Sequence, residues 1–390
     1  MDLWPENIFP GFKRTLFDRC VWIFQKIMFV FSVTLLSFLC ISNITHLLLV
    51  DRGKTFLNFT QTLMIICRQT FGLFKMYTYF KNKRELRHLL NDTFYDVPAP
   101  TCLRQQIKKY KQSCLKTPKV VSISSIIIIV ALIPVLIGAP LQVTPVLKYQ
   151  NSELVLLNLN VPKIIPQLIY IAQVLGIILV FNVAFGCIII YIALLTIAHR
   201  MLDHLHEVLK TLHHGHKKIG KNKMLHDHQQ RVADTLKYVV QHQFRINRFI
   251  TRINDFYSNV MFLEVFSLHL VFSVATFQIS QEGLTTMRYG MIPLLLIFLA
   301  IFTVCSWTAN DVEVKSAAVE EISSHASWWT WNSSNRIVGQ CVSEFANFKL
   351  HLNAGLFNSM SLDTFTDVLK ISFSYFLFLH SLHVAQRKAD

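Results

Sequence analysis

The chain has 390 residues, of which 52% are hydrophobic and only 16% are charged, and its formal net charge is +15. Soluble proteins normally carry about 25% charged residues, so the composition excludes an ordinary soluble protein and indicates a polytopic membrane protein. The basic balance does not indicate a nucleic-acid partner, because most lysines and arginines fall in two hydrophilic segments, 81–119 and 199–254, instead of on one compact domain.

Seven apolar stretches follow one another along the chain, and most are long enough to cross a bilayer as a helix. The last stretch is short and polar at both ends, so it needs protein or water around it. The sequence therefore predicts an all-α membrane protein with seven transmembrane helices. The stretches lie at 27–49, 57–79, 120–147, 165–198, 255–279, 291–309 and 362–384.

The distribution of cations between the loops predicts the orientation of these helices. Segments 81–119 and 199–254 hold ten and eleven basic residues, whereas the alternate loops hold one or two each. Loops rich in lysine and arginine stay in the cytosol. We therefore expect a cytosolic N-terminus and an extracellular C-terminus.

This topology divides the chain into consecutive parts. The predicted parts are a cytosolic arm (1–26), spans one to four (27–198, with the cytosolic loop 81–119), a cytosolic helical loop (199–254), spans five and six (255–309), cytosolic helices (310–358), and a last helix with a short outer tail (359–390).

The loop 199–254 contains nine of the sixteen histidines. Imidazoles at this density can bind zinc or copper, but the loop has no cysteine to complete a structural site and no His-Glu-x-x-His motif. Apolar residues instead recur at helical spacing. We expect a cytosolic extension of the fourth helix, with the histidines on its solvated face and no bound metal. The apolar positions are Leu202, Leu205, Val208, Leu209 and Leu212.

Arg68 and Lys75 lie within the second predicted span and Glu264 within the fifth, where charges are costly and usually face protein or water. Lys75 is near the cytosolic end of the second span, and we expect it to reach the aqueous boundary. Arg68 is nearer the middle, and the hypotheses for it are a place beside a cavity or an ion pair with Glu264 of the fifth span.

No sequence motif indicates enzymatic chemistry. There is no phosphate-binding G-x-x-x-x-G-K-[ST] loop and no nucleophile elbow around Ser323, Ser324 and His325. We expect neither an enzyme nor a cofactor. A metabotropic seven-helix receptor is disfavoured by the inverted topology and by the absence of Asp-Arg-Tyr after the third span and Asn-Pro-x-x-Tyr in the seventh.

The segment 310–352 has helical periodicity on both sides of a break that contains Trp328, Trp329 and Trp331. Clustered tryptophans need a packing partner, since large apolar patches are rarely left in water. Contacts between cytosolic parts of several subunits would provide that partner.

The C-terminal third resembles the insect odorant receptors. The resemblance rests on Trp331, Arg336, "LNAGLFNSMSLDTF" (352–365) and "SYFLFL" (374–379), whereas the first two thirds agree only in topology. The related gustatory receptors usually end in Thr-Tyr-x-x-x-x-x-Gln-Phe, where this chain has Ser374-Tyr375 and Ser381-Leu382.

The resemblance implies an odorant-gated, non-selective cation channel, built as a tetramer around one pore in the plasma membrane of a sensory neuron dendrite. It also implies assembly with a co-receptor subunit. That co-receptor has a long cytosolic insertion between its fourth and fifth spans, and 199–254 is too short to match it, so the chain resembles the odour-tuning subunit. The alternatives are a gustatory-type homotetramer and, less favoured, a metabotropic receptor.

The resemblance also implies three sets of site residues. Two cytosolic tryptophans and an arginine, Trp328, Trp331 and Arg336, belong to the subunit interface. The last helix lines the pore, with Ile371, Ser374, Phe378, Ser381 and Leu382 sharing one face through i+3 and i+4 steps. A volatile ligand binds in an apolar cavity in the outer leaflet. Candidates there are Cys67, Phe71, Val135, Gly138, Tyr170, Gln173, Val174, Phe277, Met291 and Leu295.

Overall fold

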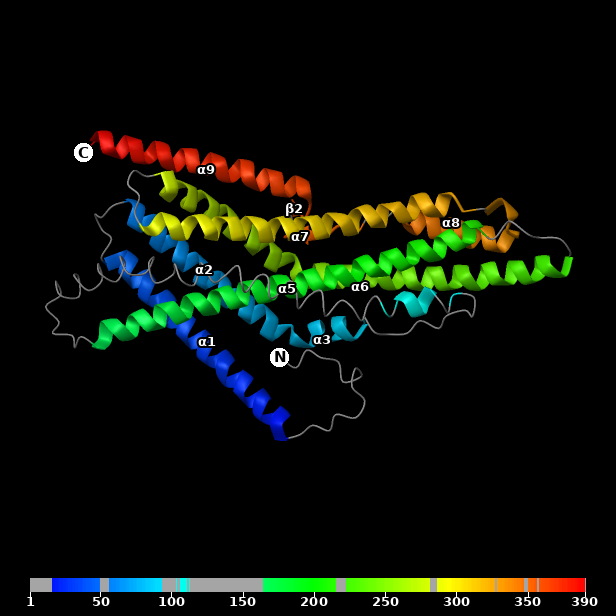
Figure 1. The fold of residues 1–390 in the computed structure, drawn as a ribbon, viewed down its shortest axis with the longest axis horizontal. Helices are drawn as coiled ribbons and strands as arrows, with labels where there is room; N and C mark the ends of the chain where they lie inside the picture. The colour runs from blue at the N-terminus through cyan, green and yellow to red at the C-terminus, as the bar shows by residue number, and fades with distance from the viewer. Residues whose placement is uncertain are drawn as a thin grey trace.

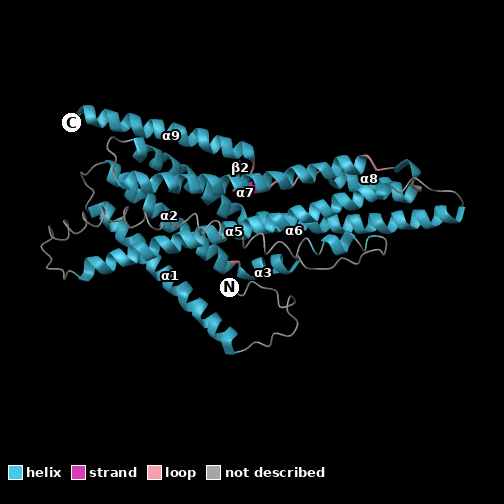
Figure 2. Cartoon of the chain, in the orientation of Figure 1, coloured by secondary structure: helices cyan, strands magenta, loops and turns pink. Residues whose placement is uncertain are grey.

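The structure is a computed structural model and is almost entirely helical in the parts of the chain that it describes (Figure 2). These are residues 16–49, 56–92, 103, 106–110, 112, 164–214, 222–280, 286–326, 328–346, 350–355 and 358–389. The helices are α1 (Leu16–Leu49), α2 (Phe56–Lys81), α3 (Lys83–Asp92), α5 (Ile164–His214), α6 (Asn222–Ser280), α7 (Thr286–Ser324), α8 (Ser333–Ala346) and α9 (Leu362–Ala389). A short 3-10 turn, η2 (Trp328–Thr330), precedes α8.

Six of the seven predicted apolar stretches lie in α1, α2, α5, α6, α7 and α9. The third, 120–147, lies outside the described residues. Among the residues described, three helices are long and apolar enough to cross a membrane, within Ile178–Leu212, His228–Phe277 and Leu295–Ser324, and a shorter apolar helix spans Phe29–Thr45. The all-helical fold is therefore confirmed, with helices that could cross a membrane.

The bundle is elongated because α5, α6 and α7 run side by side far beyond the length that a bilayer needs (Figure 1). The 51 residues of α5 correspond to about 77 Å at 1.5 Å per residue, whereas a span needs about 20 residues. The ends of α2, α5, α6, α7 and α9 that were predicted to be extracellular lie together at one end of the bundle, and α8 lies at the other (Figure 1). The ends that the topology places on one side of the membrane therefore lie at one end of the bundle, and which end is extracellular stays a prediction.

The extension of the fourth span into 199–214 is confirmed. Leu202, Leu205, Val208, Leu209 and Leu212 are all buried, as their helical spacing predicted. They pack against the first half of α6, which begins after a short connection and runs back along α5. The two helices form an antiparallel pair whose apolar stripes face each other.

The prediction that the histidines occupy the solvated face is wrong for two of them. His204 and His242 are 3% and 1% exposed. Nε2 of His204 lies 3.0 Å from the hydroxyl of Tyr238, and Nε2 of His242 lies 3.3 Å from the backbone carbonyl of Met201. A buried imidazole is tolerated when it is hydrogen-bonded, and these partners allow both rings to enter the interface between α5 and α6.

A two-stranded antiparallel hairpin, β1 (Asn353–Ala354) and β2 (Asn358–Ser359), connects the cytosolic helices to α9. Gly355 follows β1 with a φ of +79°, which favours glycine. A Cβ there would also lie 2.9 Å from the ring of Phe262. The backbone N–H of Gly355 donates to the carbonyl of Ser258, 2.9 Å away. The hairpin is thus fixed to α6 at the start of the last helix.

Candidate functional site

A buried ion pair joins α2 to α6 inside the membrane part of the bundle. The ammonium of Lys75 contacts the carboxylate of Glu264, and the two residues are 3% and 8% exposed. The expectation that Lys75 reaches the aqueous boundary is therefore wrong. Glu264 contacts Lys75, and no direct ion pair between Arg68 and Glu264 is found among the described residues. Lys75 lies six residues, or about 9 Å, before the predicted cytosolic end of α2. At this depth its side chain is surrounded by protein.

Arg68 instead lies between two aromatic rings from α5 and α7. Its guanidinium carbon is 4.5 Å from the ring centroid of Phe181 and 5.2 Å from that of Phe298. Such cation–π contacts stabilise a cation that has left water. Within the described part of the chain no acceptor lies within hydrogen-bonding distance of the guanidinium, so its N–H groups can still bind an acceptor.

A small cavity borders this region. Its lining includes Glu264 and Phe298, so it touches both the ion pair and the aromatic contact of Arg68. The volume is about 20 Å³, which is room for about one water molecule. An odorant does not fit into it.

The candidate pocket residues are divided between four described helices, α2, α5, α6 and α7, and a part of the chain outside the described residues. Phe71 packs edge-on against Phe266, with ring centroids 5.8 Å apart, and Phe277 is buried. Cys67 and Leu295 are partly buried. Tyr170, Gln173, Val174 and Met291 lie within α5 and α7, but their side chains are not among those described, and Val135 and Gly138 lie outside the described residues.

A polar seam attaches the last helix, α9, to α6. Ser372 is 0% exposed, and its hydroxyl lies 3.0 Å from Nδ1 of His269. The hydroxyl of Ser273 donates to the carbonyl of Ser372 over 3.3 Å. The predicted pore residues of α9 lie away from this seam and are all exposed in the single chain. They are Ile371, Ser374, Phe378, Ser381 and Leu382.

The three predicted interface residues have different surroundings. Trp328 is 51% exposed, whereas Trp331 is only 4% exposed and packs on Gly339 of α8. Nε of Arg336 donates to the carbonyl of Trp331 over 2.9 Å. Trp331 therefore holds the turn between α7 and α8 within its own chain, and Trp328 remains available to a partner.

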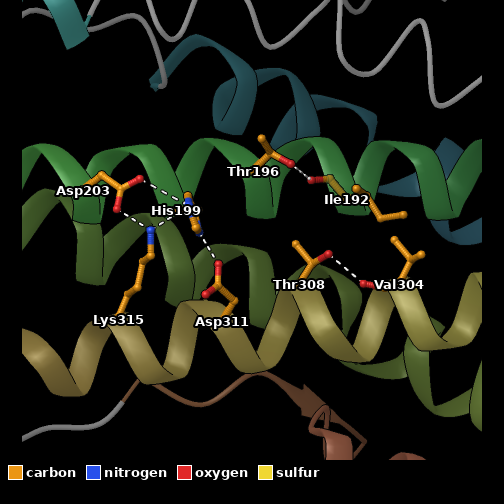
Figure 3. Close-up of polar contacts among 8 residues, drawn as sticks. All are labelled: Ile192, Thr196, His199, Asp203, Val304, Thr308, Asp311 and Lys315. Atoms are coloured by element: carbon orange, nitrogen blue, oxygen red, sulfur yellow. Dashed lines mark hydrogen bonds and ion pairs between the residues drawn. The ribbon is translucent and has the colours of Figure 1, made fainter.

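A charged cluster joins α5 to α7 where the predicted membrane spans end (Figure 3). The imidazole of His199 lies between two carboxylates, 3.2 Å from Asp203 and 2.5 Å from Asp311. The ammonium of Lys315 contacts the carboxylate of Asp203 and lies 2.7 Å from Nε2 of His199. The cluster fixes the register of the two helices.

Comparison with known families identifies this architecture. A family model described as 7tm Odorant receptor matches residues 55–373. The chain belongs to the odorant receptor family. This receptor resembles no curated protein closely enough for a match.

Solved structures support the same fold. The olfactory receptor OR5 of Machilis hrabei in complex with eugenol superposes with a TM-score of 0.73 and 16% identity, over 96% of the receptor and 93% of OR5. A second structure of OR5 gives a TM-score of 0.65 and 14% identity over 90% of the receptor and 87% of OR5.

Sequence reasoning missed Phe181 and Phe298 as partners of Arg68. Both residues are ordinary apolar positions of their spans, and phenylalanine is frequent in this chain, with 31 copies. The only signal was Arg68 itself, since a cation at membrane depth requires some partner. In the receptor, aromatic faces provide it.

Proposed function

We propose that this receptor is the odour-tuning subunit of an odorant-gated, non-selective cation channel. In this proposal it assembles with co-receptor subunits into a heterotetramer in the plasma membrane of a sensory dendrite. The observation that carries the proposal is the face of α9 that contains Ser374, Phe378 and Ser381. It is exposed in the single chain and alternates hydroxyls with a bulky ring, as a wetted passage with a hydrophobic constriction would.

The proposed ligand is a small volatile of modest polarity. OR5 of Machilis hrabei has been solved with eugenol, and we propose a cavity in the same outer region here. Phe71 and Phe277 would contribute apolar walls, and Tyr170 and Gln173 would contribute polar contacts. Ligand binding would shift the packing of the outer helices and widen the ring of α9 helices.

Co-expression tests the proposed assembly. Current that requires both this chain and the co-receptor supports the tuning subunit. Current from this chain alone would instead favour a gustatory-type homotetramer.

Phe378→Ala is expected to raise the basal current several-fold, because it replaces the bulkiest side chain on the proposed pore face with a methyl group. Currents without odorant measure the effect. The matched control is Phe373→Ala, since Phe373 is also exposed on α9, at 55% against 58%, but lies about 140° around the helix. An unchanged basal current in Phe378→Ala would remove this residue from the gate.

If the proposed odorant cavity opens as far as Arg68 when a ligand binds, Arg68→Met is expected to weaken responses to odorants that carry an oxygen acceptor. A hydrogen bond to a charged donor contributes about 1.5–3 kcal/mol, so the half-maximal concentration should rise at least about tenfold. Dose–response curves for an ester and for a hydrocarbon of the same length measure the difference. Equal changes for both ligands would show that Arg68 only supports the packing of Phe181 and Phe298.

A further inference from the structure

A second pocket lies far from the odorant region, on the cytosolic extension of α5. Its volume is about 340 Å³, within the range of small-molecule sites. One wall is α5 from Arg200 to Lys210, and the other is Lys109 and Tyr110 of the short helical segment 106–110. The odorant-binding and pore residues proposed above take no part in it.

The charges that line the pocket leave a surplus of cations. Of its two carboxylates, Glu207 accepts a hydrogen bond from Lys109 over 3.1 Å, and Asp203 contacts Lys315 of α7. No carboxylate partner is found for Arg200 or Lys210 among the described residues. The pocket therefore presents two cations whose charge is not neutralised by a contact.

Two buried nitrogen atoms point to a missing acceptor, one on Arg200 and one on His204, whose Nδ1 carries the proton when Nε2 accepts from the hydroxyl of Tyr238. Nη1 of Arg200 and Nδ1 of His204 are buried, and neither has a hydrogen-bond partner among the residues that the structure describes. The ring of His204 is held in place, because its Nε2 lies 3.0 Å from the hydroxyl of Tyr238 and the ring of Tyr110 stacks on it at 4.7 Å. Buried polar groups without partners are rare in native proteins. Arg200 and His204 both line the pocket, so a group bound there that accepts hydrogen bonds would complete them once the side chains that cover the two nitrogens move aside.

The pocket also lies where phosphate groups are abundant. Arg200 comes two residues after the end of the predicted fourth span, so the pocket borders the inner surface of the bilayer. Guanidinium and ammonium groups together recognise phosphate oxygens through charge-assisted hydrogen bonds. Basic pockets at this depth bind lipid head groups.

We propose that this pocket binds a phosphate group, held by Arg200 and Lys210 and by the imidazole of His204. The same chemistry is offered by the head group of an inner-leaflet phosphoinositide and by a free phosphorylated molecule of the cytosol. A phosphate bound in this pocket would connect segment 106–110 to α5. Phosphate binding does not depend on the odorant or on channel activity.

The test uses the purified full-length chain and two probes. Isothermal titration with inositol 1,4-bisphosphate measures the free ligand. Native mass spectrometry after mixing with phosphatidylcholine and phosphatidylinositol 4-phosphate measures the lipid. The variant is Arg200→Gln with Lys210→Gln. The control, Lys237→Gln with Arg248→Gln, removes the same charge from exposed positions of α6. Lys210 is also exposed, so Lys210→Gln alone keeps the test valid if the double variant does not fold.

The wild-type chain should bind at least one probe, and the pocket variant should bind it about tenfold more weakly, with the control unchanged. Weakening with the lipid alone identifies a lipid head group, and weakening with the soluble probe alone identifies a free phosphate. Weakening with both confirms a general phosphate site. The proposal is overturned if the wild-type chain binds neither probe, if the pocket variant binds as the wild type does, or if the control weakens equally.

Discussion

Glu264→Gln is expected to destabilise the receptor by about 3–5 kcal/mol, because it leaves the ammonium of Lys75 buried without a counter-charge. Both residues are almost inaccessible to solvent, and they are 189 residues apart in the sequence, so their contact ties α2 to α6. Lys75→Met should have an effect of similar size through the unpaired carboxylate. Melting curves of the detergent-solubilised receptor measure both changes.

The double variant Lys75→Met with Glu264→Gln separates charge from packing. It contains no unpaired buried charge at this site, so its melting temperature should return toward that of the wild type. Glu207→Gln is the control, since its ion pair with Lys109 is exposed and such pairs contribute about 0–1 kcal/mol. A double variant as unstable as the single variants would show that the ion pair is not the cause.

Trp331→Ala is expected to destabilise the turn between α7 and α8 by about 3–5 kcal/mol, since it removes a large buried side chain and leaves a cavity. The ring packs so closely on α8 that a Cβ at Gly339 would lie 2.6 Å from its Cζ3 atom. Loss of this packing should lower the melting temperature. It should also lower the yield of tetramer on detergent gels, because the proposed subunit contacts lie on the same segment of η2 and α8.

Trp328→Ala provides the contrast for this prediction. Trp328 is half exposed in the single chain, so its removal should lower the tetramer yield with little change in the melting of the isolated chain. A normal melting temperature and a normal tetramer yield in Trp331→Ala would contradict the account of Trp331. Equal decreases of the melting temperature in Trp328→Ala and Trp331→Ala would contradict the distinction between an exposed Trp328 and a Trp331 that stabilises its own chain.

Much of the fold was predictable because it follows from periodicity and hydropathy. The buried stripe from Leu202 to Leu212 predicted that the fourth helix continues beyond the membrane, and the helix does so to His214. The histidines of the same segment were misplaced, since imidazole is as compatible with a solvated face as with an interior. Burial of His204 depends on Tyr238, which lies 34 residues away.

The partners of the intramembrane charges could not be predicted from the sequence. Arg68 and Lys75 are seven residues apart, so they lie on nearly the same face of α2. Either cation could therefore meet Glu264. The axial position of α6 relative to α2 decides which cation contacts Glu264, and that position depends on the packing of the whole bundle. The pocket at Arg200 was missed for a similar reason, because segment 106–110 has no sequence signal that brings it to α5.

The ion-channel claim is tested most directly by recording from excised membrane patches that contain this receptor and the co-receptor, without GTP, during application of a panel of volatiles. A gating mechanism internal to the tetramer predicts odorant-evoked cation current in the absence of any nucleotide. Silent patches from cells that respond when intact would contradict it and would indicate signalling through a second protein.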